Sequence, residues 1–214
     1  NHGGQDAWRA GHHINGDLLG FKFGIWEGGH RVPMIVRWPG KVPADTTSDQ
    51  LISQIDMLGT FAAVTGQKRK PADGPDSVDM LPALTGTPAA PLRESLVLVS
   101  YRGVAIRKGE WMYIPNRSNS GWDNKVGIHA GGGPAIMPFT KQHTSDVVNG
   151  KIRKDAPPAQ LYNLKTDLAQ STNRYHDHPE IVEEMRALLK QFGVKAPAPK
   201  PAKPAKRPRP KKKK

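Results

Sequence analysis

Residues 20–40 of the chain read GFKFGIWEGGHRVPMIVRWPG, and the part that decides the fold is the run from residue 32 to residue 38. This run, VPMIVRW, is mostly apolar, and Pro39 and Gly40 end it with a turn signal. It therefore predicts a strand that is buried on at least one face. Residues 1–29 are rich in Gly, His and Asn, which predicts irregular loops, and loops often carry functional sites.

A helix is predicted after this strand. Gly66 ends a run in which apolar residues recur at helical spacing, namely Leu51, Ile55, Leu58 and Ala62. Thr47 and Gln50 have the spacing of a capping box. We therefore expect a helix with one buried face that includes these apolar residues and ends before Gly66. Residues 67–94 are rich in Pro, Gly and basic residues, and they predict a surface connection.

Short β-prone runs dominate the second half of the chain. Three of them cover residues 96–101, 104–107 and 111–114, and Lys108 with Gly109 joins the last two like a hairpin. A long Gly-rich loop is predicted over residues 116–155, and order returns at residues 161–164. Pro179 then opens a final helix, whose apolar face is formed by Ile181, Met185, Leu188 and Phe192.

The order of these elements predicts the fold class. A strand and a helix come first, and a short antiparallel sheet with a terminal helix follows. This order is typical of the end of an α/β layer followed by a small α+β subdomain. We place the parts at residues 1–90, 91–193 and 194–214.

The formal net charge of +13 comes mostly from the end of the chain. Residues 195–214 hold ten of the 32 Lys and Arg and no acidic residue, so the first 194 residues carry +3. Such a composition cannot bury a core, and we expect a disordered basic tail. No run approaches the roughly 18 apolar residues of a transmembrane helix. The absence of Cys excludes disulfides and a cysteine nucleophile.

Several motifs occur in a fixed order along the chain. Residues 20–29 fit G-x-K-x-x-x-x-E-G-G, and R-V-P follows at residues 31–33. Residues 79–86 read DMLPALTG, residues 105–111 read AIRKGEW and residues 161–164 read LYNL. Together they closely resemble the sulfatase family, over residues 1–193. The resemblance implies the end of an alkaline-phosphatase-like α/β domain, followed by the C-terminal subdomain of an arylsulfatase-like sulfuric ester hydrolase.

The nucleophile that this resemblance implies is missing from the sequence. Sulfatases carry it in C/S-x-P/A-x-R, whose first residue is oxidised to formylglycine, and no such motif occurs. The first residue, Asn1, is also not a methionine. We therefore expect the C-terminal portion of a sulfatase, whose formylglycine and most of whose calcium ligands come from upstream sequence. The chain alone is expected to be inactive.

Lys22 is predicted to be catalytic and to bind substrate. The resemblance places it at the family lysine that contacts the sulfate and the leaving group. Sulfate monoester hydrolysis needs cations at the non-bridging oxygens and a proton donor at the leaving oxygen. His12 and His13 lie where related sulfatases often place a histidine that lines the substrate pocket, and an imidazole can donate that proton or bind the sulfate. The sequence does not decide between them.

Asn1 is the predicted metal ligand, because it resembles the D-N-G turn of the family's Ca²⁺ site. Hard oxygen donors suit this ion, but calcium takes about six to eight ligands, so one residue cannot hold it. Glu27, Gly28, Gly29 and Arg31 are assigned structural roles. The paired glycines permit a tight turn, and Glu27 can accept backbone N–H bonds or face Arg31.

The Gly-rich loop offers weaker candidates. Residues 131–134 read GGGP, but no Gly-Lys-Ser/Thr follows, which speaks against a phosphate loop. Trp122, His129 and His143 are loop residues that could reach a substrate.

A second class of function is a polyanion-binding module, in which the basic tail binds an acidic polysaccharide, nucleic acid or an anionic membrane by counterion release. The tail has no aromatic residue for base stacking, so nucleic acid is not the expected partner. Among enzymes, phosphodiesterases and phosphonate hydrolases of the same superfamily are alternatives, but E-G-G-x-R-V-P favours sulfatases. The substrate, an aryl sulfate or a sulfated saccharide, stays open. The resemblance implies an extracytoplasmic (periplasmic or secreted) location.

Overall fold

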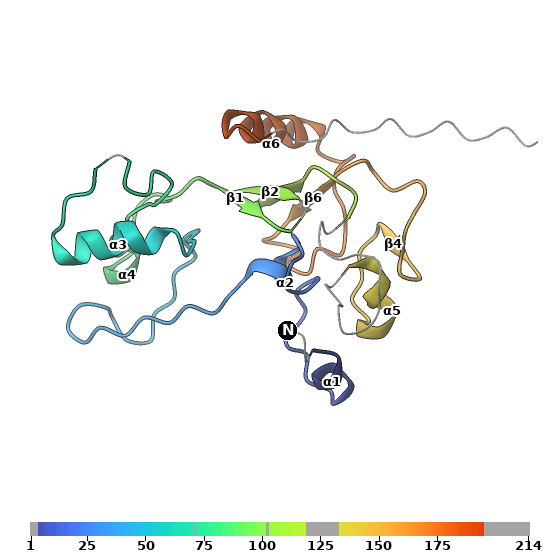
Figure 1. Cartoon of the computed structure of the whole chain (residues 1–214), viewed down its shortest axis with the longest axis horizontal. Helices are drawn as coiled ribbons and strands as arrows, with labels where there is room; N and C mark the ends of the chain where they lie inside the picture. Colours follow the sequence, from blue (N-terminus) through green and yellow to red (C-terminus); the bar gives the residue numbers. More distant parts are fainter. Residues whose placement is uncertain (1–3, 71, 102, 119–132, 195–214) are drawn as a thin grey trace, which may run out of the picture.

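The computed structural model describes residues 4–70, 72–101, 103–118 and 133–194 (Figure 1). Its helices are α1 (Gly4–Arg9), α2 (Glu27–His30), α3 (Asp56–Thr65), α4 (Leu81–Thr85), the 3-10 turn η1 (Pro134–Ile136), α5 (Met137–Thr140) and α6 (Pro179–Gln191). Its strands are β1 (Ser95–Val99), β2 (Val104–Lys108), β3 (Trp111–Ile114), β4 (Val147–Val148), β5 (Lys151–Ile152) and β6 (Gln160–Asn163). Within these ranges, every helix is too short or too polar to cross a lipid bilayer.

The centre of the fold is a four-stranded antiparallel sheet with the strand order β1-β2-β3-β6. Met112 of β3 lies opposite Arg107 of β2 and opposite Tyr162 of β6. Gly109 makes the turn between β2 and β3 with a φ of 54°, a conformation that favours glycine. The predicted meander, with its short antiparallel sheet, is confirmed.

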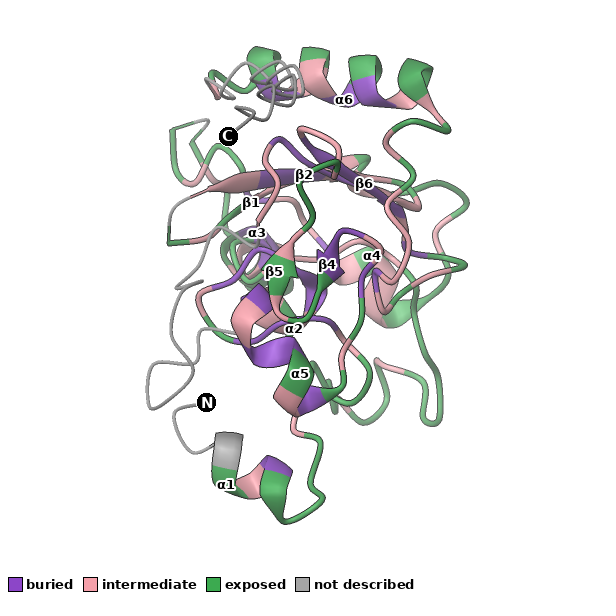
Figure 2. Ribbon diagram, turned by 90° about the vertical axis from the view of Figure 1, so that its right-hand side faces the viewer, coloured by how far each residue is buried: buried purple, intermediate pink, exposed green. Residues whose placement is uncertain are grey.

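Helix α6 covers one face of this sheet. Its buried side faces the strands and its exposed side faces outward (Figure 2). The core between them is formed by Ile106, Tyr113, Ala159, Leu161, Val182, Met185 and Leu189. The predicted terminal helix that begins at Pro179 is confirmed. Phe192 was placed wrongly on its apolar face: the helix ends at Gln191, and Phe192 is 52% exposed.

The opposite face of the sheet is covered by the segment that carries the first sequence motif. Leu19, Ile25 and Trp26 are buried there and belong to one core cluster with strand residues of β2, β3 and β6. The indole Nε1 of Trp26 donates to Oε1 of Gln160 at 2.9 Å, and the hydroxyl of Tyr162 donates to the same oxygen at 2.8 Å. Residues near the start of the chain are therefore packed on strands that follow much later in the sequence.

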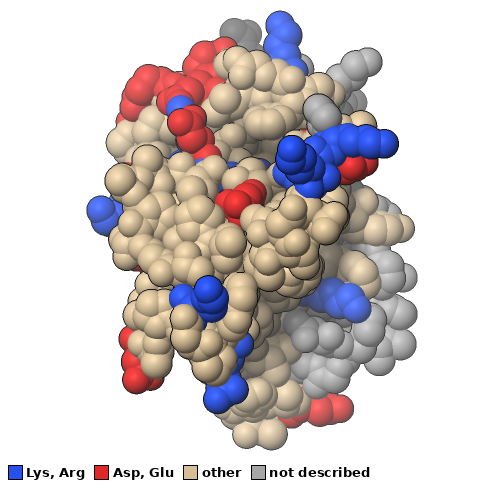
Figure 3. Space-filling model, turned by 90° about the vertical axis from the view of Figure 1, so that its left-hand side faces the viewer, with Lys and Arg blue, Asp and Glu red and all other residues tan. Residues whose placement is uncertain are grey.

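The predicted strand over residues 32–38 is wrong for this structure. None of the strands in the described ranges pairs with it, and Val32 and Ile35 are 60% and 92% exposed. An extended apolar segment becomes a strand only when a neighbour accepts its backbone hydrogen bonds. Figure 3 views the molecule from the side of α3 and α4, where most of the surface is uncharged and groups of basic and acidic side chains are scattered over it.

Helix α3 begins at Asp56 instead of residue 51, and the predicted buried apolar face is wrong. The residues that it buries are Asp56, Gly59 and Thr60. Leu58 and Phe61 are 51% and 62% exposed.

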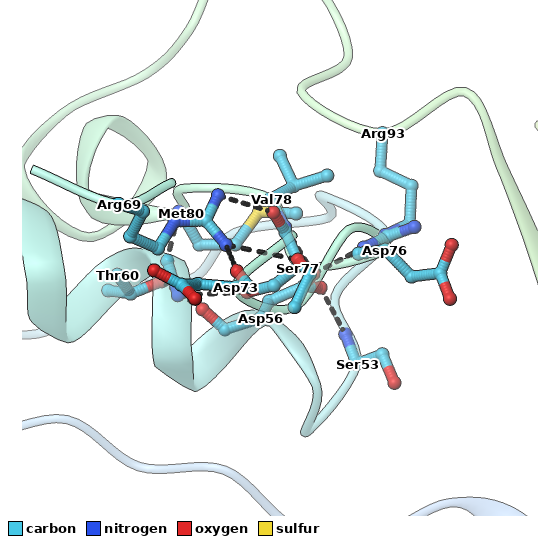
Figure 4. Close-up of polar contacts among 12 residues, drawn as sticks. Ser53, Asp56, Thr60, Arg69, Asp73, Asp76, Ser77, Val78, Met80 and Arg93 are labelled. Carbon is cyan, nitrogen blue, oxygen red and sulfur yellow. Dashed lines mark hydrogen bonds and ion pairs between the residues drawn. The ribbon is translucent and has the colours of Figure 1, made fainter. Parts of the chain in front are cut away.

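The N-terminus of α3 is set by the buried carboxylate of Asp56 and not by the predicted capping box. This carboxylate pairs with the guanidinium of Arg93 and accepts the backbone N–H of Ser53 at 2.8 Å and of Val78 at 2.9 Å. Figure 4 shows these groups converging on Asp56. Gln50, predicted to cap the helix, accepts the N–H of Leu92 at 2.9 Å through its side-chain oxygen.

The predicted Gly-rich loop over residues 116–155 contains more order than expected. Its described part holds η1, α5 and the β4–β5 hairpin. Asn149 and Gly150 form the hairpin turn, with φ of 49° and 72°. Strands of two residues are too short to show an alternating pattern in the sequence. Trp122, His129 and residues 131–132 lie outside the described residues.

Candidate functional site

The loop that carries Lys22 is held by two side-chain amides. Nδ2 of Asn15 donates to the carbonyl oxygen of Gly20 at 2.8 Å and to a carbonyl of α2 at 3.1 Å. From the second half of the chain, Nε2 of Gln142 donates to the carbonyl of Leu18 at 2.7 Å, and its Oε1 accepts the N–H of Gly20 at 3.3 Å. The backbone leading to Lys22 is thus fixed by contacts from both halves of the chain.

Lys22 itself is exposed between two aromatic neighbours. Phe21 is buried, at 5% exposure, and Phe23 has a φ of 73°, which turns the backbone sharply. Nζ of Lys22 lies 5.0 Å from the centroid of the Phe23 ring, within the range of a cation–π contact. The packed loop therefore presents an ammonium group at the surface.

The two candidate histidines differ in their surroundings, although both are exposed. The ring of His13 stacks on Trp8, with centroids 4.2 Å apart and planes within 9° of parallel. His12 is held through its backbone, whose N–H donates to the carbonyl of Ala7 at 2.8 Å. Trp8 also contacts Phe21, so His13 and the Lys22 loop share a support.

Glu27, Gly28, Gly29 and Arg31 come together in and beside the short helix α2. The carboxylate of Glu27 is fully buried and pairs with the guanidinium of Arg31. A Cβ on Gly28 would lie 2.4 Å from the carbonyl oxygen of Gly20, and one on Gly29 would lie 2.2 Å from a backbone oxygen of the same loop. Both positions therefore require glycine because the backbone approaches so closely.

His30 completes the charge cluster around Glu27. Its Nε2 lies 3.4 Å from Oε1 of Glu27. Burial lowers the pKa of His30, and the positive charges of Arg31 and Arg107 act in the same direction, while the Glu27 carboxylate opposes them. The imidazole is therefore held toward its neutral form.

The described residues contain no group of three or more His, Cys, Asp or Glu that could hold a metal ion. Asn1, the predicted calcium ligand, lies outside the described residues. The assignment of Asn1 as a calcium ligand therefore stays a prediction. His143 is exposed, and no described contact joins it to Lys22.

Four side chains that hold this region were missed by the sequence interpretation, namely Trp8, Asn15, Gln142 and Gln170, the last of which accepts the backbone N–H of Glu27 at 2.7 Å. Asn15 lies close to Lys22, so the Asn-rich loop composition was a usable signal. The two glutamines act across more than 120 residues of sequence, and no local pattern marks such a contact.

Comparison with known proteins shows what this region is similar to. The model of the Sulfatase family matches residues 11–67, which include Lys22, both histidines and the α2 cluster. N-acetylgalactosamine-6-O-sulfatase of Bacteroides thetaiotaomicron is 33% identical over 180 residues, which are 84% of this chain and 30% of that protein. Arylsulfatase G of Rattus norvegicus is 44% identical over 61 residues, which are 28% of this chain and 12% of that protein.

Solved structures agree with these relatives. A structure from work on glycosaminoglycan metabolism by Bacteroides thetaiotaomicron has a TM-score of 0.66 and 29% identity, and the match covers 86% of this chain and 33% of that one. The Ps i-CgsB complex with a neocarrahexaose has a TM-score of 0.59 at 22% identity, again over 86% and 33%, and supports the fold alone. The chain belongs to the sulfatase family, and it spans about a third of the length of the first relatives that it matches.

Proposed function

We propose that this chain is the C-terminal portion of an arylsulfatase-like sulfuric ester hydrolase. Its family membership supports this assignment. In the proposal, the formylglycine nucleophile and most of the calcium ligands come from sequence that the chain does not contain, and Asn1 adds one oxygen ligand. Calcium, when bound, supplies positive charge at the sulfate oxygens. The 214-residue chain alone is inactive.

The observation that carries the proposal is the exposed ammonium of Lys22 on a loop fixed by Asn15 and Gln142. A sulfate monoester has negative non-bridging oxygens, and negative charge develops on the leaving oxygen during S–O cleavage. A cation held in place before the reaction stabilises that charge without reorganising. We assign this role to Lys22, which binds the sulfate and donates a hydrogen bond to the leaving oxygen.

The proton for the leaving alcohol comes from a histidine of the same region. His12 and His13 are both exposed and precede the Lys22 loop. An imidazole titrates near neutral pH and can protonate an oxygen at physiological pH.

The proposed substrate is a sulfated saccharide. The relative that matches most of this chain is named for N-acetylgalactosamine 6-O-sulfate, and a neighbour at 29% identity comes from work on glycosaminoglycans. Aryl sulfates are the alternative, named by the shorter match to arylsulfatase G. Sulfatases commonly act outside the cytoplasm, and we propose an extracytoplasmic location.

The first experiment determines the coding sequence upstream of the Asn1 codon. A frame that continues into a C/S-x-P/A-x-R motif supports the proposal. A frame without that motif contradicts it and leaves a noncatalytic protein.

The encoded whole protein is then assayed for sulfate release from N-acetylgalactosamine 6-sulfate and from 4-methylumbelliferyl sulfate. Lys22→Ala is expected to lower kcat by about 100-fold or more, because it removes a charge-stabilising donor. Lys41→Ala is the matched control, because Lys41 is an exposed lysine whose described contacts are backbone only. Equal rates for the two variants would overturn the role of Lys22.

A further inference from the structure

The indole of Trp8 lies between the two segments that carry the candidate proton donor and the candidate sulfate-binding lysine. One face stacks on the imidazole of His13, with centroids 4.2 Å apart. The ring of Phe21, the residue before Lys22, meets the indole edge-to-face at 5.6 Å and 76°. One side chain thus supports both segments.

Trp8 is itself held in place by a third segment. It is 9% exposed and forms a buried cluster with Phe21 and Ile136, against which Phe139 packs. Figures 1 and 2 both show α1 next to α5, the helix that follows Ile136. The same η1–α5 segment leads into Gln142, which binds the backbone on either side of Leu19. The cluster is therefore continuous with the anchors of the Lys22 loop.

The two histidines differ in how their rings are held. Stacking fixes the plane of the His13 ring while the residue stays exposed. For His12, the described part of the chain provides a backbone hydrogen bond and no ring contact. A proton donor must be held in a defined orientation to act well, because a small misplacement lowers the rate strongly.

We propose that Trp8 is a positioning residue for this site and that His13, not His12, is the imidazole presented to the substrate beside Lys22. The proposal rests on the proposed function, since it names the proton donor of that reaction. Trp8 does not touch the substrate; it orients His13 by stacking on the imidazole, and it holds the Lys22 loop by packing against Phe21.

The geometry is tested without any enzymatic activity. In the 214-residue chain labelled with [13Cε1]-histidine, the Cε1 proton of His13 is expected to resonate upfield of that of His12, because it lies over the indole ring. Trp8→Leu is expected to abolish the difference, and Trp8→Phe to keep part of it. The ring of His178, which precedes α6, lies 4.8 Å from that of Trp111 in β3, and its resonance reports whether a variant stays folded. Coincident His12 and His13 resonances in the unsubstituted chain would overturn the proposal.

The role in catalysis is tested in the whole protein. Trp8→Leu is expected to lower kcat by about 10-fold to 100-fold with little change in KM, and Trp8→Phe to restore most of the rate. His13→Asn should remove the same limb of the pH–rate profile that Trp8→Leu disturbs, whereas His12→Asn should leave it intact. If Lys22→Ala is inactive but Trp8→Leu is fully active, this inference fails and the proposed function stands. If Lys22→Ala keeps full activity, the proposed function is the one that fails.

Discussion

The backbone N–H of Glu27 donates to Oε1 of Gln170, 143 residues farther along the chain, at 2.7 Å. Both residues are fully buried, and Nε2 of Gln170 also lies 3.4 Å from the sulfur of Met112 in the central sheet. The helix that carries the E-G-G motif is therefore anchored on the C-terminal subdomain by one side chain. The Lys22 loop precedes this helix directly, so the anchor bears on the site as well as on the fold.

Shortening this anchor should destabilise the protein. Gln170 has a φ of 55°, which Asn also tolerates, so Gln170→Asn shortens the side chain without adding backbone strain. The N–H of Glu27 would stay buried without an acceptor, and we expect the free energy of unfolding to fall by about 1–3 kcal/mol. Urea denaturation measures this difference. Gln191→Asn, at an exposed position on α6, is the control and should be nearly neutral.

The close backbone approach at α2 predicts a second loss of stability. Gly28→Ala would place a methyl group 2.4 Å from the carbonyl oxygen of Gly20, so the Lys22 loop would have to move. We expect a cost of about 1–3 kcal/mol, measured by thermal unfolding. Gly86→Ala is the matched substitution, because its methyl group would have its nearest neighbour at 3.8 Å. If the two variants have the same midpoint of thermal unfolding, the steric explanation is wrong.

The C-terminal subdomain was the part most fully predicted from the sequence. The sequences of strands β1 to β3 alternate between apolar and polar residues or are continuously apolar, and clear turn signals separate them. Pro179 begins α6 and Gly193 follows its end. Local patterns were therefore sufficient to predict these elements. Residues 32–38 have equally strong strand propensity, yet they stay unpaired, because a strand depends on a partner that no local pattern specifies.

The sequence singles out candidate site residues, but it does not mark the side chains that hold them in place. The G-x-K-x-x-x-x-E-G-G spacing singles out Lys22 and Glu27 from the sequence alone. The contacts that fix them come from Trp8, Gln142 and Gln170, and each depends on the tertiary fold. The prediction of helix α3 was wrong for a related reason. The start of this helix is set by the buried pair of Asp56 and Arg93, which lie 37 residues apart in the sequence.

The burial of His30 predicts a pH dependence of stability. The pKa of His30 is lowered in the folded state, chiefly by burial, so the unfolded chain binds this proton more readily. The contribution of His30 is therefore fully present above the unfolded pKa of about 6.5 and is lost as the pH falls below it toward the lowered folded value. Denaturation midpoints measured from pH 8 to pH 5 should fall more steeply for the unsubstituted protein than for His30→Gln. Parallel curves would show that His30 does not contribute.

The hydrogen bonds and the ion pair around Asp56 predict that loss of Arg93 strongly lowers the free energy of unfolding and loosens the structure near Asp56. Arg93→Leu leaves a fully buried carboxylate without its cation, and breaking such a pair costs about 3–5 kcal/mol. Hydrogen exchange should accelerate at the amides of Ser53 and Val78, which donate to this carboxylate. Arg153→Leu removes one member of an exposed pair with Asp155 and should change little. Slow exchange at both amides in Arg93→Leu would contradict the assigned role.

The basic tail allows a separate test of polyanion binding, although residues 195–214 lie outside the described residues. The tail holds ten positive charges, and its removal leaves a formal net charge of +3. Because binding to a polyanion releases counterions in proportion to the charges engaged, deleting residues 195–214 should lower the salt concentration that elutes the protein from heparin and flatten the dependence of retention on salt. Replacing the ten basic residues by Gln keeps the length of the tail, and so separates the effect of its charge from the effect of its presence. Retention that is unchanged by both alterations would exclude the tail as a polyanion-binding element and leave it a solvated extension.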